Sequence, residues 1–169
     1  QESLVMLNTG LMHSGANLKS FYILPEDASI ENIFSPISGQ VSAILGEGSA
    51  AMNTGDIWVG SLTEFEGAKG YWVVTEAALA FSYDLTNLSE DAATRLSPER
   101  APVGYEYNQS VEQAFYFIEK VQNIEPGDWI LVYNGDEVIG AREWTGSIID
   151  VPAMGDDGSD YTKGYMEAG

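Results

Sequence analysis

The segment WILVYNGDEVIGAREW, residues 129–144, constrains the fold more than any other part of the chain. Two runs rich in β-branched and aromatic residues, 129–133 and 137–142, flank Asn134-Gly135-Asp136. An Asn-Gly pair between such runs supplies the positive φ angles of a tight hairpin turn. The segment therefore predicts a β-hairpin, and the turn alone explains its Asn-Gly-Asp triplet.

Short strand patterns recur elsewhere in the chain, and no segment shows the sustained period of an amphipathic helix. Strands are expected at 21–24, 40–52, 56–62, 70–85, 114–121 and 147–154, with a short strand or arm within 1–14. The stretch 70–85 fits either two strands or one long bent strand. A helix starting at Val111 competes with the strand at 114–121.

One brief helix is expected at residues 27–34, where Ile30, Ile33 and Phe34 recur at helical spacing. Asp27 or Ser29 can cap its start, and Pro36 is expected to end it. Together with the strand patterns, this predicts a mostly β protein of two small sandwich-like units with one or two short helices.

The polar, turn-rich stretch from residue 86 to residue 103 contains Pro98 and Pro102 and interrupts the strand patterns. We therefore expect an N-terminal unit at 1–85, a linker at 86–103 and a C-terminal unit at 104–169.

The formal net charge of −19 limits the partners that the chain can bind. Such a surface repels the phosphates of nucleic acids and anionic membranes. No apolar run approaches the roughly 20 residues of a membrane span. The chain has no Cys, so thiol catalysis and Cys-based zinc sites are excluded.

Two Gly-Asp turns, at residues 55–56 and 127–128, each lead into a strand that carries a Trp. Trp58 and Trp129 are expected to fold over the edge of the core and anchor these turns. The four Trp residues and neighbouring Tyr residues could also form sugar-stacking platforms, because aromatic faces pack well on flat ligands. Trp144, beside Arg142, is expected to be the most exposed, and with Tyr133 these residues are the candidate ligand-binding set.

The segment MGDDGSD places Asp156, Asp157, Ser159 and Asp160 within five residues. Calcium binds six to eight oxygen ligands and tolerates irregular loops. The loop is therefore a candidate calcium site, although its spacing is not that of an EF-hand and acidic turns are commonly only solvated.

Catalytic patterns are weak. His13 is the only histidine, and Ser14 is too close in sequence to be presented to it as the nucleophile of a triad. The segment GEGSAAMNTG lacks the Lys of a phosphate-binding loop. Among 26 acidic residues, no pair is marked as a glycosidase pair. The sequence therefore favours a protein that is not an enzyme.

Two longer patterns combine these elements. The first is Gly-x-Asn, Ser-Phe, a short helix, Trp-x-Gly-Ser-Leu and Gly-Tyr-Trp, at residues 15–17, 20–21, 27–34, 58–62 and 70–72. The second is Asn-Gly-Asp-x-x-x-Gly and Pro-Ala-Met-Gly-x-Asp-Gly, at residues 134–140 and 152–158. Together they resemble tandem accessory repeats of large secreted surface proteins from marine and Bacteroidetes-like bacteria.

This resemblance implies an extracellular or cell-surface, non-catalytic β module, often attached to adhesins or hydrolases. In that family a further strand is expected after the final loop. The expected function is binding or adhesion, with a polysaccharide or a surface protein as partner. A phage virion or fibre protein is the first alternative, and a glycoside hydrolase, which needs a cleft with convergent acids, is the second.

Overall fold

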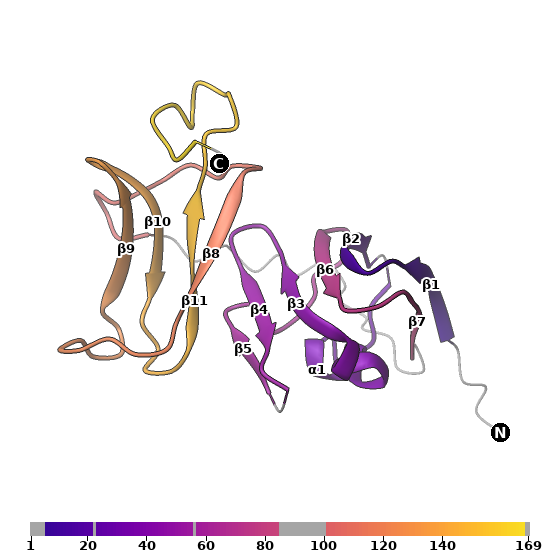
Figure 1. Ribbon diagram of the computed structural model, residues 1–169. Coiled ribbons are helices and arrows are strands. Elements are labelled where there is room, and N and C mark those ends of the chain that lie inside the picture. The colour runs from indigo at the N-terminus through magenta and orange to yellow at the C-terminus, as the bar shows by residue number, and fades with distance from the viewer. Residues whose placement is uncertain (1–5, 22, 56, 85–100, 168–169) are drawn as a thin grey trace. The chain divides into compact units, whose positions relative to one another are not determined.

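A computed structural model describes residues 6–21, 23–55, 57–84 and 101–167 (Figure 1). The chain divides into two compact units, residues 1–96 and 97–169. Most of the predicted linker, 86–103, lies outside the described residues. The described part of the chain is mostly β, with several small sheets and one short α-helix, which confirms the predicted fold class.

The first unit contains a five-stranded antiparallel sheet with the strand order β2-β6-β3-β4-β5. Its strands are β2 (Gly15–Ser20), β3 (Val41–Leu45), β4 (Ala50–Asn53), β5 (Trp58–Gly60) and β6 (Gly70–Thr75). The stretch 40–52 thus holds two strands joined by a Gly-containing turn.

The strand expected at 21–24 is wrong. β2 ends at Ser20, and Phe21 and Leu24 instead turn into the core, where they are 1% and 5% exposed. The carbonyl of Phe21 accepts a hydrogen bond from the Ala68 N–H, outside any regular ladder. Burial of these apolar side chains therefore outweighs their preference for an extended strand.

The stretch 70–85 forms two strands, and both belong to one bent antiparallel ribbon. β1 (Met6–Met12) pairs with β7 (Leu79–Asp84) just beyond the end of the β2–β6 pairing. At the bend, the buried amide of Asn17 donates to the carbonyls of His13 and Gly15, and the Thr75 hydroxyl donates to the His13 carbonyl. These bonds satisfy backbone groups that the corner would otherwise leave without partners.

The predicted helix is α1 (Ile30–Phe34), with Ser29 as its N-cap. The Ser29 hydroxyl accepts a hydrogen bond from the backbone N–H of Asn32, as a cap residue does. The α-helix ends at Phe34, and a 3₁₀ helix that contains Pro36, η1 (Ser35–Gln40), follows directly. Both the helix and one of its two proposed caps are therefore confirmed.

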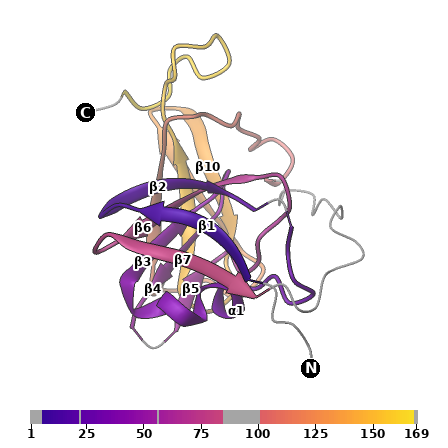
Figure 2. The same ribbon diagram turned by 90° about the vertical axis from the view of Figure 1, so that its right-hand side faces the viewer.

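The core of the first unit lies between the five-stranded sheet on one side and the β1–β7 ribbon with α1 on the other (Figure 2). Aromatic rings from different elements meet there. Phe34 of α1 stacks on Phe81 of β7 with ring centroids 4.7 Å apart, and Phe21 packs on Phe65 at 4.4 Å. Such pairs add to the stabilisation from buried apolar area.

The second unit contains two antiparallel strand pairs. β8 (Gln113–Ile118) pairs with β11 (Ile149–Met154), and β9 (Trp129–Asn134) pairs with β10 (Glu137–Glu143). A strand rather than the competing helix is therefore confirmed in the stretch 114–121, although it ends at Ile118. The predicted hairpin is confirmed as well, but its two central residues are Gly135 and Asp136, and positive φ falls on Gly135 (62°) rather than on Asn134.

β10 and β11 are neighbouring strands in this unit (Figure 1), and their backbones approach closely at Gly140. A Cβ atom added to Gly140 would lie 1.7 Å from the Pro152 carbonyl oxygen, so only glycine fits there. The small apolar core next to this contact consists of Ile139, Ala153, Met154 and Tyr165.

Candidate functional site

The candidate ligand-binding residues of the hairpin differ sharply in exposure. Tyr133 is 48% exposed, but Trp144 and Arg142 are each only 6% exposed. The expectation that Trp144 is the most exposed Trp is therefore wrong. Its backbone N–H donates to the Asp128 carbonyl and its carbonyl accepts from the Gly127 N–H, so Trp144 fastens the second Gly-Asp turn.

Arg142 is committed to a buried ion pair with Asp150. Its Nη2 lies 3.0 Å from Oδ2 of Asp150, and its Nε donates to the Asp150 carbonyl at 3.0 Å. The ion pair joins β10 to β11, because the two residues lie on these strands. Arg142 therefore has a structural role in this unit. Of the three candidates, only Tyr133 lies on the surface.

The acidic loop satisfies much of its own hydrogen bonding. The Asp157 carboxylate accepts from the hydroxyl of Thr162 at 2.7 Å and from the N–H of Ser159 at 3.0 Å. These bonds, first that from Thr162 and then those from Ser159, hold the pKa of Asp157 well below its ordinary value. Asp156 in turn accepts from the Gly158 N–H.

Asp156, Asp157, Ser159 and Asp160 therefore lie in one loop, but two of the carboxylates are already used by local turns. Within the described ranges, no group of three or more His, Asp or Glu side chains is arranged to hold a metal ion.

The two Trp residues expected behind the Gly-Asp turns are the first residues of β5 and β9. Gly55 and Gly127 both have positive φ, 98° and 99°, as the turns require. Trp58 is half-buried and packs against the core of the first unit, which agrees with its predicted anchoring role. The indole ring of Trp58 also borders a pocket.

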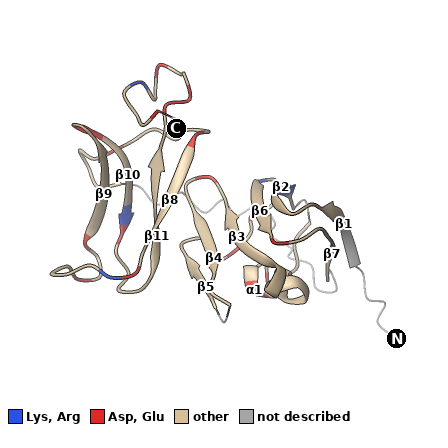
Figure 3. Ribbon diagram, viewed as in Figure 1, with Lys and Arg blue, Asp and Glu red and all other residues tan. Residues whose placement is uncertain are grey.

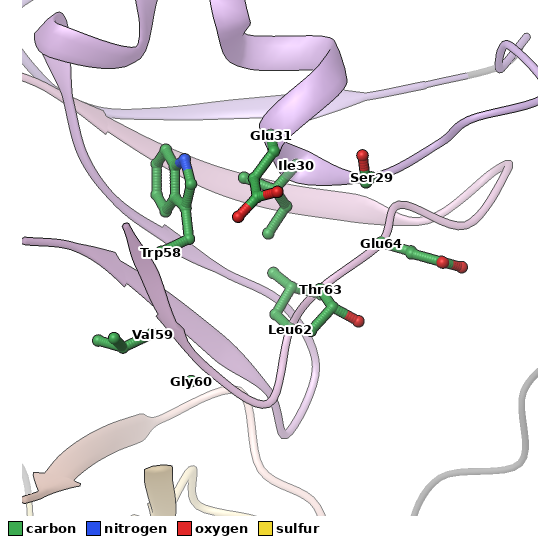
Figure 4. Close-up of a pocket in the computed structure, with 9 residues that line it drawn as sticks. All are labelled: Ser29, Ile30, Glu31, Trp58, Val59, Gly60, Leu62, Thr63 and Glu64. Carbon is green, nitrogen blue, oxygen red and sulfur yellow. The ribbon is translucent and has the colours of Figure 1, made fainter. Parts of the chain in front are cut away.

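A pocket of about 210 Å³ opens beside the indole of Trp58 (Figure 4). Three segments line it: the start of α1, strand β5 and the chain that follows β5. The lining residues are Ser29, Ile30, Glu31, Trp58, Val59, Gly60, Leu62, Thr63 and Glu64.

Backbone contacts fix these segments together. The N–H of Ile30 donates to the Thr63 carbonyl at 3.0 Å, and Ser29 and Glu64 form an antiparallel β-bridge. Gly60 has a φ of 129°, and a Cβ there would lie 2.2 Å from the Ala50 carbonyl oxygen. The Trp-x-Gly-Ser-Leu motif thus requires its glycine for close packing of β5 on β4.

Two polar groups of the pocket, on Trp58 and Glu31, are available to a ligand. No side-chain hydrogen bond or ion pair joins the indole N–H of Trp58 or the carboxylate of Glu31 to any described residue. Because no buried side-chain N or O atom in the described part of the chain lacks a partner, the free indole N–H is accessible. In Figure 4 the Glu31 carboxylate extends toward Trp58, whereas Glu64 extends away from both.

The sequence pattern indicates Trp58 as a turn anchor and marks neither Glu31 nor Thr63 as a site residue. Glu31 lies 27 positions before Trp58, so no local pattern joins them. Two features point weakly to this site. One is the acidic residue beside the capped start of the helix, and the other is the Trp that begins a short edge strand.

Acidic positions are spread over loops and strand ends of both units, and basic positions are few (Figure 3). Among the described residues, no helix is both long and apolar enough to span a membrane. No family model matches this chain, and neither the curated proteins nor the solved structures include a significant match.

Proposed function

We propose that this protein is a non-catalytic binding module of the secreted or cell-surface type, and that the Trp58 pocket holds a sugar ring of a polysaccharide. The observation that carries the proposal is a small pocket with an accessible indole beside a carboxylate, where neither the indole N–H nor the carboxylate bonds to another described residue. An aromatic face packs against the C–H face of a sugar, while hydroxyls bond to the polar groups at its edge.

Three features of the pocket support a sugar over a large protein surface. Its volume of about 210 Å³ lies below the roughly 300–1,000 Å³ that encloses a drug-sized ligand, so it suits one small ring. Trp58 is held by the core, which limits the entropy lost on binding. The Glu31 carboxylate and the exposed Thr63 side chain lie at the rim, where ligand hydroxyls need partners.

A binding role fits the arrangement of acids better than glycoside hydrolysis does. Glycosidases hold two carboxyl groups on opposite sides of the bond that is cleaved, at most about 9.5 Å apart. Here Glu64 extends away from Glu31 instead of facing it across the pocket (Figure 4). Incubation with a bound oligosaccharide should release no product.

A glycan array followed by calorimetry tests the proposal. The wild-type protein should bind at least one oligosaccharide, and Trp58→Ala should weaken that binding by about tenfold or more, since stacked aromatic anchors contribute on the order of 1.4 kcal/mol. Trp72→Ala is the matched control, because Trp72 is 45% exposed but does not line the pocket. Binding that survives Trp58→Ala but not Trp72→Ala would refute the assignment.

Solution oligomeric state separates the virion alternative. A monomer that binds glycans fits the module, whereas a stable trimer without glycan binding would favour a fibre or decoration protein.

Calcium binding at residues 156–160 stays a separate proposal. A metal bound only by the folded state raises the melting temperature. The melting temperature in millimolar calcium should then be higher than in chelator. Identical melting curves would refute calcium binding by this loop.

A further inference from the structure

We infer that the Trp58 pocket selects a cationic sugar, an amino sugar with a free protonated amine, over neutral and anionic sugars. This inference rests on the proposed function and specifies its ligand class. It begins from the charges around the pocket rather than from the aromatic ring itself.

The pocket lining carries negative charge without a compensating cation. Glu31 and Glu64 are both exposed, and no Lys or Arg is among the lining residues that the structure describes. Residues 1–83 hold 9 acidic and 2 basic residues, a net charge of −7. An anionic sugar, such as a uronate, would therefore meet repulsion on approach.

Both basic residues of this stretch are engaged at other places. Lys69 forms an ion pair with Glu66 at 2.8 Å. Lys19 donates from Nζ to the Leu11 carbonyl at 3.3 Å, on the edge strand β2 at the opposite end of the sheet order from β5. Neither lysine lines the pocket, and no other described residue forms an ion pair with Glu31, so its charge is left for a ligand.

Trp58 and Glu31 are complementary to an ammonium group in two ways. A cation over an indole face is attracted by the ring quadrupole, more strongly for Trp than for other aromatic residues. A carboxylate forms a charge-assisted hydrogen bond to the same ammonium group, stronger than a bond to a neutral hydroxyl. The ring and the carboxylate face one pocket (Figure 4), so one protonated amino sugar can use both.

Calorimetry with three matched tetrasaccharides at mildly acidic pH tests the inference. The probes are a β-1,4-glucosamine tetramer, its fully N-acetylated form and a uronic acid tetramer. We expect the glucosamine tetramer to bind about tenfold more tightly than the acetylated form, and the uronate not to bind detectably. Added salt should reduce this preference, because it screens exposed charges.

Two variants connect the preference to the pocket. Glu31→Gln should weaken binding of the glucosamine tetramer about fivefold, which corresponds to ~1 kcal/mol, and leave binding of the acetylated tetramer nearly unchanged. Glu47→Gln, a substitution of an exposed acid outside the pocket lining, removes the same charge and should change neither affinity.

The outcomes separate this inference from the function on which it rests. Equal binding of the two tetramers, with loss of both in Trp58→Ala, would overturn the cation preference and keep the sugar pocket. Equal effects of Glu31→Gln and Glu47→Gln would reduce the preference to net charge and overturn the role of Glu31. Trp58-dependent binding of a lysine peptide without any sugar binding would overturn both.

Discussion

The first unit buries aromatic rings from distant elements, whereas the second buries an ion pair and a backbone contact. In the first, Phe21, Phe34, Phe65 and Phe81 pack with centroids 4.4 to 6.4 Å apart. In the second, Arg142 and Asp150 are 6% and 0% exposed, and β10 approaches β11 so closely that Gly140 can carry no side chain.

Two units with similar β-strand patterns are therefore stabilised by different interactions. Packing of rings depends on apolar area and tolerates small shifts between side chains. A buried ion pair and a backbone contact depend on exact geometry, because a misplaced charge or carbonyl cannot be repacked. Substitutions that remove side-chain volume should therefore destabilise the first unit. Substitutions that disturb the ion pair or the spacing of the strands should destabilise the second.

The largest expected effect is that of Gly140→Ala. Its new Cβ would fall 1.7 Å from the Pro152 carbonyl oxygen, so β10 and β11 must separate. We expect destabilisation of at least about 4 kcal/mol, a size that only severe defects reach. Hydrogen exchange should show lost protection in β10 and β11. Gly39→Ala, which meets nothing within 4 Å, is the control. Retained protection in Gly140→Ala would contradict the close approach of the strands.

Phe21→Ala should rank next and test the aromatic core. The residue is 1% exposed and contacts the rings of Phe34, Phe65, Tyr71 and Tyr83, so truncation leaves a cavity among them. The expected loss in the free energy of unfolding is about 3–5 kcal/mol by denaturant titration. Phe21→Leu should cost clearly less. Equal losses for the two variants would show that ring volume is not what stabilises this unit.

Arg142→Met should destabilise by about 3 kcal/mol, because it leaves the Asp150 carboxylate buried without its cation. The double variant Arg142→Met/Asp150→Leu should regain much of the loss, since both charges are then removed. Chemical denaturation of the two variants and of the single Asp150→Leu completes the cycle. A double variant no better than the single ones would mean that the ion pair is not the source of the effect.

The smallest effect is expected from Thr162→Val in the acidic loop. The variant removes the buried hydroxyl that donates to Asp157 and should cost about 1 kcal/mol at neutral pH. Because the folded state holds the pKa of Asp157 below its ordinary value, this stabilisation is present above that value and is lost as the pH falls below it. Melting curves across the acidic range should show a shallower pH dependence for the variant. A slope identical to that of wild type would separate Thr162 from the titration of Asp157.

Much of the local structure follows from the sequence. The hairpin at 129–142, the Ser29 cap and the strand at 114–121 are confirmed because turns, caps and alternation act between neighbouring residues. The strand at 21–24 is wrong because Phe21 is buried by contacts with α1 and β7, which strand propensity does not contain.

The candidate site residues show even more clearly that local sequence patterns do not predict tertiary contacts. Tyr133 is exposed as a surface candidate must be, but Trp144 and Arg142 are taken into the interior by partners at Asp128 and Asp150. The sequence does not mark Glu31 as a site residue, because nothing near it in the chain distinguishes it from other acidic residues.

The amino-acid sequence alone determined that this chain forms short strands, tight glycine turns and one capped helical turn, since these depend on backbone preferences over a few residues. The tertiary structure decided which aromatic and charged side chains are buried and which meet. Trp58 and Glu31 share a pocket only because the start of α1 pairs with residues 63–64 after β5. Many different long-range pairings are compatible with the same local patterns. The local sequence therefore does not determine which pairing forms.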